Sequence, residues 1–154
     1  MEIIAATDNH VNEIVELWKE FEDYHGKLDP YFSTKEDGHT IFEKHIRERI
    51  ESEDALVLVA LDGENVVGSS IARIDKYPPV YKNETYGYVG FMAVTHNCRR
   101  KGIGEQMLDE IFKWFKLRGI HRVELKVRVK NKLGYAFWKK HGFRDYEHNL
   151  YVDL

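Results

Sequence analysis

The fold of this chain is decided by the stretch Val94-Thr95-His96-Asn97-Cys98-Arg99-Arg100-Lys101-Gly102-Ile103-Gly104. The stretch follows an apolar, β-like run over residues 88–94 and precedes a periodic apolar pattern that predicts a helix over residues 103–117. Free amides and the helix dipole favour an anion at such a helix start, and glycines allow its close approach. The basic side chains add charge and donors. The turn therefore predicts a pyrophosphate-binding site.

Length and composition indicate one ordinary globular domain over residues 1–154. The chain has 43% apolar and 32% charged residues, which argues against disorder. No apolar run approaches the roughly 20 residues of a membrane span, and the N-terminus does not resemble a signal peptide. The single cysteine, Cys98, excludes an internal disulfide framework. We therefore expect a cytoplasmic protein without a membrane partner.

Charge is distributed unevenly along the chain, although its net value is only −3. Residues 1–94 carry 9 basic and 19 acidic side chains, whereas residues 95–154 carry 14 basic and 7 acidic ones. The C-terminal part therefore favours an anionic ligand, and the N-terminal part could attract a cation. Ordinary variation between helix surfaces explains the acidic part equally well.

The first half of the chain predicts a strand and two helices. An apolar strand covers residues 2–6, and Thr7 and Asp8 offer caps for a helix that breaks near residues 24–26. A linker over residues 24–33 is rich in His, Asp and Tyr. Thr34 is expected to cap a second helix. The buried stripe of that helix would be Ile41, Phe42, His45, Ile46 and Ile50.

The second half predicts strands over residues 54–61, 66–76 and 86–94, with a hairpin turn at 62–65 and a proline-containing loop at 77–84. After the helix over 103–117 come a strand over 121–129, a helix from Asn131 to Gly142, and a strand over 143–152. The order β-α-α-β-β-β-α-β-α-β predicts an α/β fold with a mixed central sheet flanked by helices.

Two segments in register resemble the GNAT superfamily of acetyl-CoA-dependent N-acetyltransferases. Residues 99–104, Arg-Arg-Lys-Gly-Ile-Gly, resemble the family's Gln/Arg-x-x-Gly-x-Gly/Ala turn. Residues 131–143, from Asn131 to Gly142 and Phe143, resemble its Asn…aromatic-x-x-x-Gly-Phe signature. The resemblance implies that the strand before the turn and the strand after the following helix splay apart to admit the cofactor.

The resemblance also assigns cofactor-binding roles. Backbone groups of Met92, Ala93 and Val94 would pair with the pantetheine arm of CoA like an added strand. The pyrophosphate would be held by the amides of Arg99, Arg100, Lys101, Gly102, Ile103 and Gly104. Asn131 would bond the pantetheine, and the helix that carries Tyr135 and Trp138 would pack along the thiol end.

The pattern departs from the family in its acid and its base. Trp138 stands where a tyrosine often protonates the leaving thiolate, and Tyr135, one turn earlier, is a partial substitute. The strand over 86–94 carries no carboxylate, although many members have a glutamate there as base. Glu84, His25 and Asp29 remain as candidates, and catalysis by positioning with solvent taking the proton fits equally well.

The acceptor channel is expected beside two glycines in the strand over 86–94. Gly87 and Gly90 suggest a bulge or a close approach by a ligand. Tyr86 and Tyr88 would then flank the channel. Tyr31 and Phe32 would close it from above, with His25 and Asp29 nearby, although core packing explains each aromatic residue as well.

We therefore interpret the chain as an N-acetyltransferase that moves an acetyl group from acetyl-CoA to a primary amine, without a metal. The acceptor would be a cationic small molecule, a lysine side chain or a protein N-terminus. A non-catalytic acyl-CoA sensor of the same fold is the alternative. A nucleic-acid partner is not expected, because CoA phosphates account for the basic residues and the acidic half would repel a polyanion. Pairing of residues 143–154 across a two-fold axis predicts a homodimer.

Overall fold

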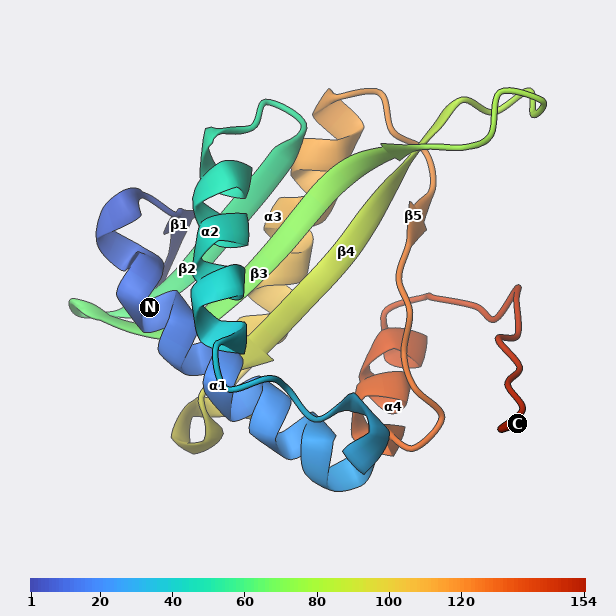
Figure 1. The fold of residues 1–154 in the computed structure, drawn as a ribbon. Coiled ribbons are helices and arrows are strands. Elements are labelled where there is room, and N and C mark those ends of the chain that lie inside the picture. Colours follow the sequence, from blue (N-terminus) through green and yellow to red (C-terminus); the bar gives the residue numbers. More distant parts are fainter.

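In the computed structural model, which describes residues 1–154, a five-stranded sheet carries helices on both of its faces (Figure 1). The strands lie in the order β1-β2-β3-β4-β5, and β5 alone is parallel to its neighbour, β4. The predicted mixed sheet is therefore confirmed. The strands are β1 (Glu2–Ala5), β2 (Ala55–Asp62), β3 (Asn65–Lys76), β4 (Thr85–Val94) and β5 (Val123–Glu124).

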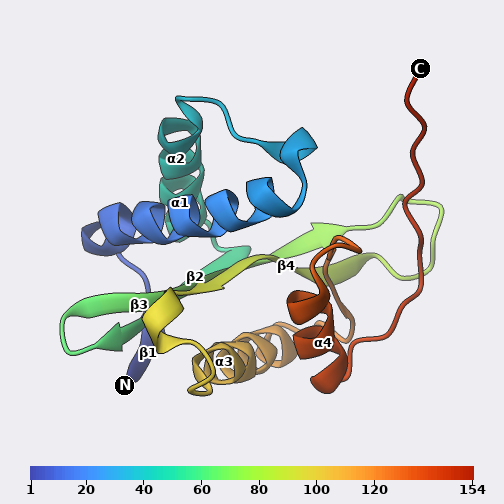
Figure 2. The same ribbon diagram turned by 90° about the horizontal axis from the view of Figure 1, so that it is seen from below.

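Two cores lie on opposite faces of this sheet. Helices α1 (Val11–Leu28) and α2 (Gly38–Glu51) cover one face, and α3 (Ile103–Leu117) covers the other, with α4 (Lys132–Lys140) beside it (Figure 2). Both faces of β2 are buried: Val57 and Val59 pack towards α1 and α2, while Leu58 and Ala60 pack towards α3. This double burial explains why β2 is almost continuously apolar.

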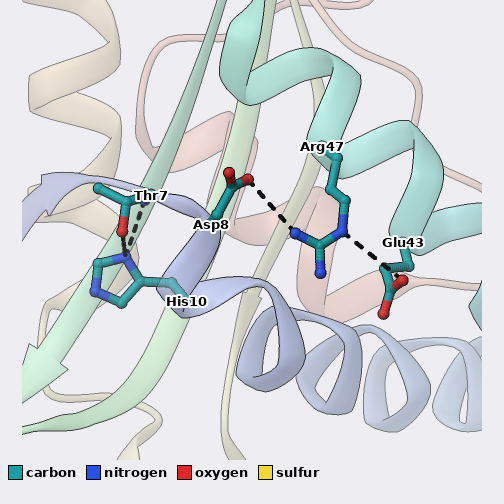
Figure 3. A network of polar contacts seen from close by, with 5 residues as sticks. All are labelled: Thr7, Asp8, His10, Glu43 and Arg47. Carbon is teal, nitrogen blue, oxygen red and sulfur yellow. Dashed lines mark hydrogen bonds and ion pairs between the residues drawn. The ribbon is translucent and has the colours of Figure 1, made fainter.

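Short 3-10 helices connect the larger elements: η1 (Asp8–His10), η2 (Pro30–Phe32) and η3 (His96–Cys98). Arg47 of α2 forms ion pairs with Asp8 (3.5 Å) and with Glu43 (3.8 Å), as Figure 3 shows. His10 Nδ1 accepts a hydrogen bond of 3.0 Å from the Thr7 amide. The Arg47–Asp8 pair joins the segment before α1 to α2, although such an exposed ion pair contributes little stability.

The first half of the chain differs from the predicted helix bounds. Helix α1 continues past Gly26 to Leu28, because His25 extends its buried face by packing on Phe21, with ring centroids 4.2 Å apart. Helix α2 begins after Asp37 instead of Thr34. Ile41, predicted to be buried, is 57% exposed, so the α2 core contact is made chiefly by Ile46 and its partly buried neighbours.

In the second half, one predicted strand is much shorter than expected and another is absent. Helix α3 has the predicted bounds, but β5 is only two residues long, and residues 125–129 pair with no strand. Residues 143–154 form no strand at all, and Leu150 and Val152 are 92% and 78% exposed. A strand needs a neighbouring edge to bond its backbone groups. Residues 125–129 diverge from the open edge of β4, and residues 143–154 pair with no strand.

Two structural tests bear on metals and membranes. No three His, Cys, Asp or Glu side chains come together in a way that could hold a metal ion. None of the helices combines the length and apolar character needed to cross a bilayer.

Candidate functional site

Strands β4 and β5 separate after two paired positions, as the family resemblance implies. Gly87 pairs with Val123 and Tyr88 with Glu124, and beyond them the edge of β4 over residues 89–94 faces no strand on that side (Figure 1). The chain after β5 runs instead to Asn131 and α4. The backbone groups on this open edge are free to bond an extended ligand.

Gly87 and Gly90 of β4 are accommodated by different features of the structure. A Cβ on Gly87 would lie 2.6 Å from the Phe115 ring, so this glycine admits α3 and not a ligand. Gly90 is the extra residue of a β-bulge, because Ile71 pairs with Phe91 and the next residue of β3 pairs with Val89. The bulge bends β4 where it leaves β5, which opens the gap between the two strands.

The start of α3 offers the predicted anion site. Gly102 is the N-cap residue with φ +80°, and no side chain caps the helix. The first hydrogen bond within the helix runs from the Gln106 amide to the Gly102 carbonyl (3.0 Å). The amides of residues 103–105 therefore have no carbonyl partner within the helix. Arg100 and Lys101 are exposed and form no ion pair. Backbone donors and free cations therefore meet at this turn, as a phosphate requires.

Arg99 has a different role from its neighbours in the turn. Its Nε donates to the Val94 carbonyl (3.0 Å), and its guanidinium lies 3.5 Å from Glu20 of α1. Glu20 also accepts hydrogen bonds from the Thr95 hydroxyl (3.2 Å) and the His96 amide (2.8 Å). The Arg99 side chain therefore ties η3 to α1. Nothing in the sequence pattern connected Glu20 with this turn.

Helix α4 packs against the start of α3. A Cβ on Gly104 would lie 3.3 Å from Phe137 and 3.7 Å from the sulfur of Met92, so this glycine lets the three elements meet. Asn131 caps α4, because its Oδ1 accepts from the Gly134 amide at 3.0 Å, and its Nδ2 makes no bond within the chain. The structure therefore brings α4 against Met92 of β4 and against the start of α3.

The two aromatic residues singled out on α4 point to different surroundings. Trp138 packs against the α3 core, with its ring 5.4 Å from that of Phe143. The Tyr135 hydroxyl donates to the Asp145 carboxylate, at 3.0 and 3.1 Å. Lys139 lies beside the same carboxylate at 3.7 Å. The Tyr135 phenol is therefore already engaged with the C-terminal segment.

Tyr86 and Tyr88 lie on the sheet face opposite α3, because Gly87 between them faces Phe115 of α3. The Arg73 guanidinium lies over the Tyr88 ring at 4.2 Å and bonds Asp75 at 3.0 Å. Tyr86 stacks on Tyr77 at 4.3 Å. Burial raises the pKa of both Tyr86 and Tyr88, so each phenol stays protonated at neutral pH.

The end of α1 and η2 meet the segment that leaves β5. Asp29 pairs with Lys130 (3.8 Å), and the Arg128 guanidinium lies 3.7 Å over the Phe32 ring. His25 is 9% exposed, and burial, followed by the charge of Arg128, lowers its pKa, so its imidazole is neutral at neutral pH. These contacts join the end of α1 and η2 to the segment after β5. Tyr31 is 83% exposed.

Glu84 and the turn over residues 99–104 lie at opposite ends of β4. Glu84 directly precedes this strand in the exposed loop, whereas the turn follows the end of the strand. Ten extended residues separate the two ends of β4, which corresponds to about 30 Å. The structure therefore does not bring Glu84 to the turn at which the anion is expected.

Glu124 is a polar centre that the sequence did not indicate. Its carboxylate accepts hydrogen bonds from Tyr77, from Tyr146 (2.5 Å) and from Arg122 (3.0 Å). Burial alone would raise the pKa of Glu124, but these bonds outweigh it and lower the pKa. The ionised carboxylate therefore joins the loop over 77–84, β5 and the C-terminal segment. Only its place in an alternating pattern could have drawn attention to it.

The comparisons with known proteins agree with this geometry. The Acetyltransferase (GNAT) family matches residues 12–143. A mutant of the BH1408 protein from Bacillus halodurans superposes with a TM-score of 0.92, at 22% identity, covering 100% of this chain and 99% of the other. A predicted acetyltransferase with acetyl-CoA, from Clostridium acetobutylicum, gives a TM-score of 0.79 at 21% identity, covering 99% and 95%.

Similarity to curated sequences is more limited. N-alpha-acetyltransferase 30 of Xenopus laevis is 26% identical over 88 residues, or 57% of this chain. The match covers 31% of that protein, so the chain spans about a third of the curated relative's length.

Proposed function

The chain belongs to the GNAT family of acetyltransferases, and from this premise we propose that it transfers an acetyl group from acetyl-CoA to a primary amine. One observation carries the proposal: the open edge of β4 leads directly into the uncapped start of α3. An extended arm that ends in a pyrophosphate fits this combination of a free strand edge and a helix N-terminus.

The residues present fit acetyl-CoA. The amides at the start of α3, with Arg100 and Lys101, would hold the pyrophosphate, and the β4 edge at residues 92–94 would bond the pantetheine arm. The free Nδ2 of Asn131 would donate to the same arm. Binding to the folded state alone, at 100 times the Kd, should add about 2.7 kcal/mol, which corresponds to roughly 5–10 °C in melting temperature. No shift at millimolar acetyl-CoA would exclude the cofactor.

Acetyl transfer makes three chemical demands on the chain. An amine with an ordinary pKa near 10.4 must lose a proton before its lone pair can attack. A backbone amide on the open edge of β4, near Ala93 or Val94, would polarise the acetyl oxygen. Tyr135 could protonate the leaving sulfur only after its hydroxyl turns away from Asp145. Tyr135→Phe should therefore lower kcat but leave acetyl-CoA binding unchanged.

The acceptor that we propose is a cationic primary amine, because the N-terminal part of the chain is strongly acidic. A screen over polyamines, amino acids, aminoglycosides, lysine peptides and free peptide N-termini would identify the class. We expect the best acceptors to lose kcat/KM with rising salt, since exposed charges attract a cation less when they are screened. Equal rates for cationic and neutral amines at low salt would contradict this proposal.

A non-catalytic acyl-CoA sensor is the second candidate. Trp138 in place of an acid, and a β4 strand without a carboxylate, both favour it. Free thiol release separates the two candidates. Tight acetyl-CoA binding without thiol release on any amine would favour the sensor, whereas release that depends on an amine would favour the enzyme.

We also propose a homodimer formed through residues 143–154. This segment has alternating apolar residues that are exposed, and Tyr146 anchors its start on Glu124. The same residues of a second copy would offer a strand edge with which this segment could pair. Light scattering should give twice the chain mass, and Leu150→Lys with Val152→Lys should return it to one. A monomeric mass for the unchanged protein at micromolar concentration would contradict the dimer.

A further inference from the structure

The partly buried carboxylates around the gap between β4 and β5 are paired, with one exception. Glu22, on α1, is partly buried and makes no hydrogen bond or ion pair. A partly buried carboxylate without a partner carries a desolvation cost that the fold does not recover, which is typical of a group kept for a ligand. The paired, partly buried ones are Glu20, Asp29, Asp75 and Glu124.

Glu22 lies on the turn of α1 that covers the bulge of β4. Its neighbour Phe21 packs edge-on against Phe91, with ring centroids 5.0 Å apart, and Phe91 directly follows the bulge residue Gly90. His25, one turn later, packs on Phe21 from the same helix. This turn of α1 therefore lies where β4 leaves β5, on the sheet face opposite α3.

The segment after β5 lies opposite this turn of α1. Arg128 lies over Phe32 at 3.7 Å, and its charge acts on both Glu22 and His25. Figure 1 shows the end of α1 beside the chain that leads from β5 to α4. An amine that approaches the open edge of β4 from the α1 side would pass between Glu22 and this segment.

We propose that Glu22 takes the proton from the acceptor ammonium, directly or through one water. This rests on the proposed acetyl transfer and names a catalytic residue for it. The cationic amine first pairs with the free Glu22 carboxylate. This pairing also accounts for an acidic side chain that has no partner within the chain.

The reaction balances with the groups named. The ammonium N–H bond breaks, its proton passes to the Glu22 carboxylate, and the nitrogen keeps the electron pair. That pair forms the bond to the acetyl carbon of acetyl-CoA, while the carbon–sulfur bond breaks and its electrons leave with sulfur. The second amine proton neutralises the leaving thiolate through solvent, and Glu22 returns its proton to bulk water.

The surroundings of Glu22 suit a base. Burial raises its pKa, and the positive charge of Arg128 offsets part of that rise. On its own helix it neighbours Lys19, which is paired with Glu16, and His25, whose neutral imidazole adds no charge. A carboxylate with a raised pKa is a better proton acceptor near neutral pH than an ordinary one.

The test compares Glu22→Gln with Glu16→Gln in the full-length protein. Glu16 lies on the same helix and is exposed, so it controls for the loss of one negative charge. We expect Glu22→Gln to lower kcat about 100-fold and to remove the acidic limb of the kcat/KM profile, with acetyl-CoA binding unchanged. Glu22→Asp should keep the limb at a reduced rate.

Thermal melting distinguishes a base from a structural residue. The raised pKa means that ionised Glu22 destabilises the fold above that pKa, so Glu22→Gln should melt at or above the temperature of the unchanged protein at pH 8. A lower melting temperature, or an intact acidic limb, would overturn the proposal. Absence of thiol release by the unchanged protein with every amine would instead refute the acetyl transfer itself.

Discussion

Asn131 has two roles in this account, and two substitutions separate them. Its Oδ1 caps α4 through the Gly134 amide at 3.0 Å, and its free Nδ2 is proposed to donate to acetyl-CoA. Asn131→Ala removes both roles. It should cost about 1 kcal/mol of stability and lower the melting temperature by roughly 2–4 °C. Asn131→Asp keeps an equally good cap but has no N–H to donate.

Calorimetric titration with acetyl-CoA provides the assay. The loss of one hydrogen bond, worth about 0.5–1.5 kcal/mol, should weaken binding by Asn131→Asp roughly 2- to 12-fold while its melting temperature stays near that of the unchanged protein. An unchanged Kd would show that Asn131 is a cap alone. A large loss of stability in Asn131→Asp would refute the capping geometry.

Gly134→Ala gives an independent check on the cap. A Cβ at Gly134 would lie 2.9 Å from Asn131 Cγ, so the cap must move. Glycine to alanine within a helix normally gains up to about 1 kcal/mol. We expect the opposite sign at this position, measured by thermal melting, and a gain in stability would contradict the observed packing.

Three further predictions concern the turn, the polar centre and the core. Arg100→Glu should weaken acetyl-CoA binding, most strongly at low salt, and should leave the melting temperature of the free protein unchanged. Arg99→Ala should lower that melting temperature, because it removes the contact between η3 and α1. Equal melting temperatures for the two variants would contradict this difference in roles. Glu124→Gln should cost about 1.5–3 kcal/mol at pH 7. Because the folded pKa of Glu124 is lowered, the deficit should vanish as pH falls through that pKa, and a deficit that persists in acid would argue against ionised Glu124. Gly87→Ala would place a Cβ 2.6 Å from the Phe115 ring, and the overpacking should cost about 1–3 kcal/mol in denaturant unfolding; a cost below 0.5 kcal/mol would show that α3 can shift.

The fold was predictable wherever a segment carried its own signals. Helix α3 has the predicted bounds, because its apolar face is regular and a glycine with positive φ lies just beyond each end. The strand predicted over 121–129 is shortened to β5, and the one predicted over 143–152 is absent, for a common reason. Alternation of apolar and polar residues shows that a segment suits a sheet, but it does not show that a partner strand is available. Because β4 and β5 separate after Tyr88, the residues after Glu124 do not pair with β4.

The local geometry of the candidate site was predictable on the proposed cofactor side and less so on the proposed acceptor side. Backbone amides and glycines at the start of α3 depend on local chain geometry, which a short motif specifies. The partners of charged side chains come from distant segments, so the pairing of Arg99 with Glu20 and the isolation of Glu22 had no local signal. Arg99 therefore looked like a phosphate ligand in sequence, although its side chain ties η3 to α1.

The central claim is acetyl transfer from acetyl-CoA to an amine, and the most direct test measures both products in one reaction. Free thiol and acetylated amine should appear in equal amounts, and neither should form when the amine is omitted. Thiol release that continues without an amine, or an acetylated amine that does not match the thiol released, would contradict the account.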